Sequence, residues 1–191
     1  MKKIKLMLGL GLLLVFGTSN IKAQNLYSNF PEKFDTEFIK DEYGDADADL
    51  KTGNWRLKGA KLVTKKNGIE IEADGTKGLQ FISNNKGPMV AEMKFDLLDG
   101  ASKVTVLSSS FGEDATSKWM LQASTDGGKK WKQVGKEVFV DNKLARTETF
   151  EVDIKGTVRF RILKMALGSI KDDSSIQNGR LVVDNIAVYK K

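Results

Sequence analysis

The sequence predicts an all-β protein, a single antiparallel β-sandwich of about nine to eleven strands. Two observations carry this prediction. Apolar and polar residues alternate with a period of two through much of the chain, and Asn-Gly or Asp-Gly turn signals separate the alternating runs. Only two prolines occur, Pro31 and Pro88, and both lie just outside the alternating runs.

The chain opens with a segment that is typical of a secretory signal peptide. Lys2, Lys3 and Lys5 precede a short apolar run from Leu6 to Phe16, and Ala23 closes a plausible cleavage site. The apolar run is too short to span a bilayer. We therefore expect residues 1–23 to be removed and residues 24–191 to form one exported domain, in the periplasm, on the outer surface or secreted, without a transmembrane segment.

Composition excludes several classes of function. The whole chain carries a net charge of +6, but residues 1–23 hold four lysines and no acid, so the remainder carries 27 basic against 25 acidic side chains, or +2. A nucleic-acid partner is therefore not expected. The chain has no Cys and no His, which excludes disulfides, Ser-His-Asp or Cys-His catalysis, and zinc sites that contain His.

The predicted strands follow one another from the middle of the chain to its end. Alternation runs through 89–97, 104–106, 119–123, 149–154 and 158–162. We expect the last two to follow one another across the turn at Lys155-Gly156. The final run, 180–189, is apolar at both parities and is therefore predicted to be a central strand.

Residues 124–131 form one recognisable local motif. Ser124, Asp126, Gly128 and Trp131 match the S-x-D-x-G-x-x-W pattern of Asp-box hairpins. In such a hairpin the Asp side chain accepts backbone N–H groups, glycine supplies a positive φ and the Trp caps the turn. Only one copy is present, which predicts a structural hairpin without a catalytic role.

The densest charge cluster is the acidic stretch 41–49. Asp45, Asp47 and Asp49 could offer oxygens to Ca²⁺, although Leu50 and Arg56 break the EF-hand pattern. The alternative is a solvated loop. Tyr43, within this stretch, is the aromatic residue that we expect to stack on a sugar ring.

Asp184 shares the parity of Val182, Ile186 and Val188 in the final strand, where a carboxylate is costly unless it is paired or binds a metal. Its partner could be Ca²⁺, held together with Asp35 or Glu37, or a nearby arginine. The alternative is a β-bulge that turns Asp184 outward.

Arg159 and Arg161 form a basic stripe on one face of a predicted strand. They could contact an acidic ligand such as an anionic polysaccharide. The simpler expectation is cross-strand pairing with Glu151 or Asp153.

Several segments together resemble the jelly-roll accessory modules of secreted Gram-negative proteins, which are similar to galactose-binding-like domains and carbohydrate-binding modules. The segments are 51–55, 93–96, 108–112, 119–131, 158–162 and 182–186. The resemblance implies a jelly-roll sandwich and a non-catalytic binding role. It also implies a structural Ca²⁺ between the first and last strands, which supports Asp184 with Asp35 or Glu37 as metal ligands.

We therefore predict a binding module for a carbohydrate or a cell-surface glycan. Its expected ligand contacts are Tyr43, Asp45, Asp47, Arg159 and Arg161. Two alternatives remain open at this point. One is a structural or protein-interaction component of the cell envelope or surface, with a surface protein as partner. The other is a carboxylate-dependent glycoside hydrolase, for which no pair of acids stands out in the sequence.

Overall fold

The computed structural model describes residues 25–38, 40–64, 77–83, 87–112, 114–141, 145–167 and 178–191. The predicted leader, residues 1–23, lies outside them, as do the predicted turns at Asn67-Gly68 and Asp74-Gly75. The described residues contain eleven strands: β1 Asp45–Leu50, β2 Gly53–Lys58, β3 Ala60–Thr64, β4 Lys77–Phe81, β5 Met89–Met93, β6 Ala101–Ser110, β7 Ser117–Ser124, β8 Lys132–Val140, β9 Arg146–Ile154, β10 Arg159–Met165 and β11 Leu181–Tyr189. None of these described residues forms a helix that could cross a membrane.

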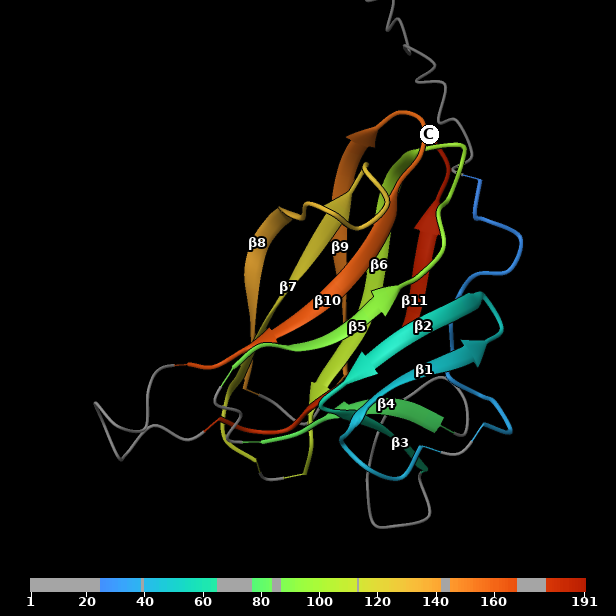
Figure 1. Cartoon of the computed structure of the whole chain (residues 1–191). Coiled ribbons are helices and arrows are strands. Elements are labelled where there is room, and N and C mark those ends of the chain that lie inside the picture. The colour runs from blue at the N-terminus through green and yellow to red at the C-terminus, as the bar shows by residue number, and fades with distance from the viewer. Residues whose placement is uncertain are drawn as a thin grey trace, which may run out of the picture.

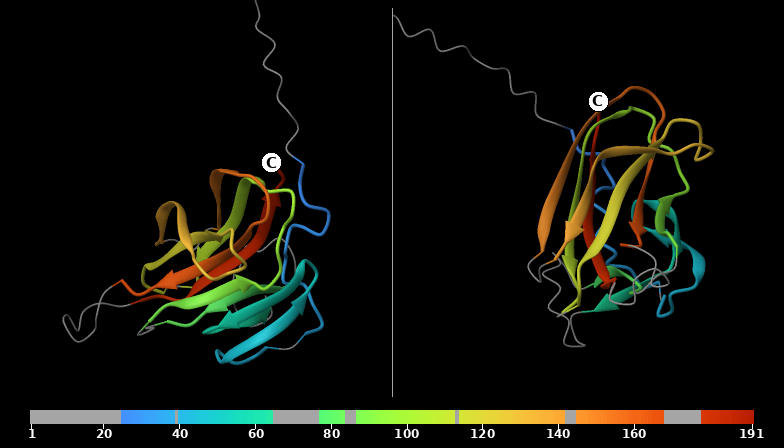
Figure 2. Two further views of the ribbon diagram at one scale, coloured as in Figure 1. Left: turned by 45° about the horizontal axis from the view of Figure 1, so that its top comes forward. Right: turned by 90° about the vertical axis from the view of Figure 1, so that its left-hand side faces the viewer.

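The strands form two antiparallel sheets that pack face to face (Figure 1; Figure 2). The six-stranded sheet has the order β1-β2-β5-β10-β7-β8, and the five-stranded sheet has the order β3-β4-β11-β6-β9. This confirms the predicted all-β sandwich. It also confirms that the last strand is central, because β11 lies third of five.

The core lies between the sheets and is built from one parity of each strand. Its largest side chains, Trp55 and Trp119, are 1% and 0% exposed. Met93, Leu121 and Phe160 join them in the same apolar cluster. Burial of such side chains contributes roughly 1.5–3 kcal/mol each, which lets the domain fold without disulfides.

Residues 45–49 of the acidic stretch belong to strand β1, where we had expected a metal loop or a solvated loop, and residues 41–44 precede that strand. Ala48 and Leu50 point into the core, and Asp45, Asp47 and Asp49 point outward. Aspartate is depleted in strands, but charged residues suit an edge strand because they discourage pairing with another chain. The expectation of a loop was therefore wrong for residues 45–49.

The predicted succession of residues 149–154 and 158–162 is present, but the two strands do not pair. β9 pairs with β6 in the five-stranded sheet, whereas β10 pairs with β5 and β7 in the six-stranded sheet. The turn at Lys155-Gly156 therefore crosses from one sheet to the other.

The N-terminal segment is anchored along β11 by a buried carboxylate. Glu32 is 1% exposed and forms an isolated β-bridge with Ile186. Its Oε1 accepts the backbone N–H of Phe34 at 2.8 Å, and its Oε2 accepts the N–H and the hydroxyl of Thr52 at 3.1 and 2.7 Å. Phe34 has a φ of 56°, a conformation that is costly for a bulky residue and is stabilised here by its contact with Glu32.

Candidate functional site

The outer face of the six-stranded sheet carries a continuous row of hydrogen-bonding side chains. The strand registers align one residue from each of the six strands. In strand order these residues, which we call the polar row, are Asp47, Arg56, Glu92, Arg161, Gln122 and Gln133. Because residues opposite one another in neighbouring strands are about 5 Å apart, the row forms a single strip at right angles to the strands.

Arg161 is the centre of the polar row. Its Nε donates to Oε1 of Gln122 at 2.7 Å, and its Nη1 lies 3.3 Å from Oε2 of Glu92. Partial burial lowers the pKa of Arg161, and the contact with Glu92 opposes this shift. The guanidinium is therefore held in place and remains charged at neutral pH, with its planar fork in a defined direction.

The arginines do not pair with Glu151 or Asp153, so that prediction was wrong. Both acids lie on β9, in the other sheet. The Nε of Arg159 instead donates to Oδ1 of Asp96 at 2.6 Å. The acidic partners of the two arginines, Glu92 and Asp96, lie on β5 or just after it, because β5 neighbours β10 in the sheet.

Asp47, at the β1 end of the polar row, and Asp45 on the same strand are both held by ion pairs. Asp45 accepts two hydrogen bonds from Arg56, at 2.9 and 2.6 Å. These hydrogen bonds are the main reason that the pKa of Asp45 is lowered. Oδ2 of Asp47 accepts a hydrogen bond from Nζ of Lys94 at 2.6 Å. Such exposed pairs stabilise the fold by less than about 1 kcal/mol each, but they fix the direction of their oxygens.

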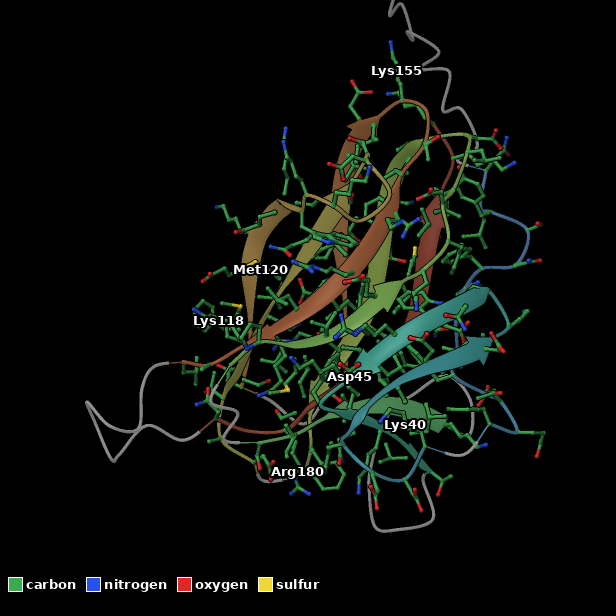
Figure 3. All side chains as sticks on the ribbon, in the orientation of Figure 1. Lys40, Asp45, Lys118, Met120, Lys155 and Arg180 are labelled. Atoms are coloured by element: carbon green, nitrogen blue, oxygen red, sulfur yellow. The ribbon has the colours of Figure 1, made fainter. Side chains whose placement is uncertain are left out.

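Apolar residues form the next register row of the same face. Leu163 lies between Val90 of β5 and Met120 of β7. Figure 3 shows Met120 toward the β8 edge of this sheet and Asp45 at its β1 edge. Farther along β8, Phe139 is 59% exposed. The face therefore offers apolar contacts beside its hydrogen-bonding groups.

The Asp-box hairpin has the predicted local structure. Oδ1 of Asp126 accepts the N–H of Lys130 at 2.9 Å, and Oγ of Ser124 accepts the N–H of Gly128 at 2.9 Å. Gly127 and Gly128 have φ values of 73° and 86°. These contacts confirm the hairpin that the sequence pattern predicted.

Trp131 was predicted only to cap this hairpin, and its place on the outer face of the six-stranded sheet was missed. Its half-buried ring lies under the guanidinium of Arg161, 4.3 Å from Cζ to the ring centroid. The ring is thereby held beside the polar row by a cation–π contact. The signal for this role is the last position of the Asp-box motif, but the sequence does not show which strand the ring reaches.

Tyr43 lies apart from the other predicted ligand residues. Its hydroxyl donates to Oε1 of Gln80 on β4, and Nζ of Lys61 on β3 lies 4.9 Å from its ring centroid. Burial is the main cause of its raised pKa. Tyr43 therefore packs against the five-stranded sheet. The other four predicted ligand residues lie on the outer face of the six-stranded sheet, and of these only Asp47 and Arg161 belong to the polar row.

The predicted calcium ligands Asp35, Glu37 and Asp184 do not gather in one cluster of three carboxylates. Within the described ranges, no three Asp or Glu side chains lie close enough together to hold a metal ion. Oδ1 of Asp35 accepts the N–H of Lys77, and Glu37 is exposed. A register shift between Asp184 and Ala187 supplies the β-bulge that was the alternative. It reverses the parity, so Asp184 shares the face of Val182 rather than that of Ile186, although it remains 1% exposed.

A second buried charge lies at the far end of β10. Lys164 is 0% exposed and shares the inward parity of Phe160 and Ile162. Burial lowers its pKa from 10.5 to about 8, and the charge of Asp114 opposes this shift. Asp114 forms a two-pronged ion pair with Arg180, with distances of 2.7 Å to Nε and to Nη2.

Comparisons with known proteins show the fold. No protein-family model and no curated protein sequence matches the chain. Among solved structures, the K2 cleaved adhesin domain of Lys-gingipain is similar, with a TM-score of 0.56, 13% identity, and coverage of 83% of this chain and 96% of that one. The CBM22-1 xylan-binding domain of Paenibacillus barcinonensis Xyn10C is similar with a TM-score of 0.51, 10% identity, and coverage of 88% and 96%.

A third similar structure holds the CBM22-1 and GH10 modules of Clostridium thermocellum xylanase 10B. The TM-score is 0.50 and the identity 11%, with coverage of 88% of this chain and 29% of that one. At these identities the similarity shows the fold alone. It confirms the resemblance to the sandwich of carbohydrate-binding modules that the sequence predicted.

Proposed function

We propose that this chain is a non-catalytic carbohydrate-binding module that holds a glycan chain on the outer face of its six-stranded sheet. The observation that carries the proposal is the polar row with Trp131 beside it. A sugar presents hydroxyls at its edge and C–H groups on its faces. It therefore needs both hydrogen-bonding side chains and an aromatic ring.

The polar row matches the hydrogen-bonding needs of sugar hydroxyls. Each hydroxyl both donates and accepts, and the row alternates donors such as Arg161 with acceptors such as Glu92. The amides of Gln122 and Gln133 supply both functions. Because these groups are already fixed by their neighbours, a ligand loses little affinity to their ordering.

The dimensions and charge of the row favour a neutral oligosaccharide. Six strands at about 4.8 Å spacing give a strip of about 24 Å, which is longer than a single sugar. Within the row, the charges of Asp47 and Glu92 balance those of Arg56 and Arg161. A ligand without net charge therefore suits the centre of this face.

The electrostatics of the carboxyl groups support a non-catalytic role. A glycosidase needs one carboxylic acid with a raised pKa. The pKa values of Asp45, Asp114, Asp126 and Asp153 are all lowered, so none of these four has the property that such an acid needs. The proposal also places the domain outside the cytoplasm, on the strength of the leader predicted at residues 1–23.

The test is a binding screen of residues 24–191 against neutral polysaccharides, including xylan, galactan and mixed-linkage glucan, by affinity electrophoresis and calorimetry. We expect Trp131→Ala to weaken binding at least tenfold, about 1.4 kcal/mol. Tyr43→Phe is the control and should bind as the native protein does. Binding that survives Trp131→Ala in a variant with native melting behaviour would contradict the assignment of this face.

A protein-interaction role is the second candidate, favoured by the exposure of Phe139 on the edge strand β8. Edge strands with an apolar side chain can pair with another chain. This candidate predicts no polysaccharide binding and a self-association or partner contact that Phe139→Ser abolishes.

A further inference from the structure

A hollow lies at the end of the sandwich, and Gln133 is the one member of the polar row that also lines it. It has a volume of about 540 Å³ and lies between the Asp-box hairpin and the ends of β8 and β9. Apolar side chains of both sheets line its inner part, namely Ala123, Val134 and Ile154. Its remaining lining is polar: Thr125, Asp126, Lys130, Lys132, Gln133, Asp153 and Lys155.

The Asp-box hairpin gives this hollow a fixed wall. The backbone N–H of Lys130 is held by Asp126, whose Oδ1 also accepts the hydroxyl of Ser124 at 2.8 Å. The next residue, Trp131, contacts Arg161 on the outer face of the six-stranded sheet. The hairpin therefore contributes one residue to the outer face and the preceding one to the hollow.

The hollow has a surplus of positive charge. Lys130, Lys132 and Lys155 are all exposed at its edge. Figure 3 shows Lys155 at one end of the molecule, opposite the end that carries Arg180. The two carboxylates are already engaged, because Asp126 accepts hydrogen bonds within the hairpin and Asp153 lies 2.5 Å from Nζ of Lys191.

We propose that this hollow binds an acidic sugar residue, either a uronate or a sulfated sugar. The inference rests on the proposed carbohydrate-binding function and adds a second site with a different ligand class. The ring's C–H face would lie on Val134 and Ile154, and its carboxylate or sulfate would face the three lysines. The centre of the polar row has no such surplus of positive charge, because its charges are balanced.

The test is a titration of ¹⁵N-labelled residues 24–191 with trigalacturonate and, separately, with neutral galactotriose. The site variant is Lys130→Gln, Lys132→Gln and Lys155→Gln combined. The matched control is Lys51→Gln, Lys129→Gln and Lys136→Gln, which removes the same charge from exposed lysines outside the hollow. We expect trigalacturonate to shift the amide signals of Lys130, Val134 and Ile154 and to bind the site variant at least tenfold more weakly. The control should retain the native affinity.

Parallel titrations with sulfated galactose and with inorganic sulfate show whether the hollow recognises an acidic sugar or only a free anion. Binding of either acidic sugar with a tenfold preference over inorganic sulfate supports the proposal. Equal binding of inorganic sulfate, or equal loss in both lysine variants, overturns it, because the hollow would then act only as general positive charge. A Trp131→Ala variant that loses polysaccharide binding but keeps trigalacturonate binding separates the two sites. If neutral glycans fail to bind while trigalacturonate binds the hollow, the proposed function of the outer face fails and the hollow remains.

Discussion

Replacing the buried Lys164 tests whether the interior of this sandwich carries a charged amine at a cost. Lys164 is fully buried on β10, between Trp119 of β7 and Met89 of β5 in the register of the sheet. Its pKa falls from 10.5 to about 8. Because the folded state holds the proton less tightly than the unfolded state, the penalty is complete below pH 8 and disappears as the pH rises past 10.5.

The expected magnitude follows from that interval. Each pH unit between the two pKa values corresponds to about 1.4 kcal/mol, so the charged amine lowers the free energy of unfolding by up to about 3 kcal/mol at pH 7. Lys164→Met has a similar volume and no charge. We expect the variant to be more stable than the native protein at pH 7, and this advantage to shrink by about 2 kcal/mol between pH 7 and pH 10.

The assay is urea unfolding of both proteins at pH 7, 8, 9 and 10, followed by tryptophan fluorescence. Other groups that titrate in this range are common to both proteins, so their effects cancel in the difference. A difference in unfolding free energy that stays constant from pH 7 to pH 10 would refute the reasoning. The reasoning would also be refuted if the variant were less stable than the native protein by the same amount at pH 7 and at pH 10.

Two further substitutions test the other buried or paired carboxylates. Glu32→Gln should lower the free energy of unfolding by about 3 kcal/mol in urea titration, because an amide cannot accept all three hydrogen bonds that the Glu32 carboxylate accepts. The control is Glu37→Gln, on an exposed residue. Equal effects of the two substitutions would contradict the stabilising role of Glu32. Asp114→Asn should cost about 1–3 kcal/mol at pH 7, since Arg180 lowers the pKa of Asp114 chiefly by hydrogen bonding. The stabilisation by Asp114 is present above the ordinary Asp pKa near 4 and is lost as the pH falls through the lower pKa of the folded state. The melting temperatures of the native protein and the variant should therefore converge in acid. A difference that persists at pH 2 would contradict the role of this ion pair.

The period-two pattern was sufficient to predict the class of fold and the burial of its largest side chains. Phe160 and Ile162 point inward and Arg159 and Arg161 outward, as their alternation indicated. The final strand was predicted to be central because it lacks a polar face. These features depend only on neighbours along the chain, which a single sequence displays directly.

The polar row could not be predicted, because it depends on which strands become neighbours. Glu92 and Arg161 are far apart in the sequence and meet only when β10 pairs with β5. Local order in the sequence suggested Glu151 as the partner, since β9 precedes β10 across a short turn. The orientation of Asp184 was also not fixed by the alternation of its strand, because the β-bulge after it reverses the side to which later residues point.

The path of the N-terminal segment along β11 has a mechanical consequence. Tyr27 and Glu32 bond to the backbone of Val188 and Ile186, and the N–H of Lys190 donates to the carbonyl of Asn25 at 2.7 Å. The two ends of the folded domain are therefore neighbours. Tension applied through both ends would break these hydrogen bonds one after another, starting from the pair nearest the two ends. The two sheets would stay intact until the N-terminal segment had separated from β11. A domain joined in this way can also be placed within a loop of another protein without spreading that loop.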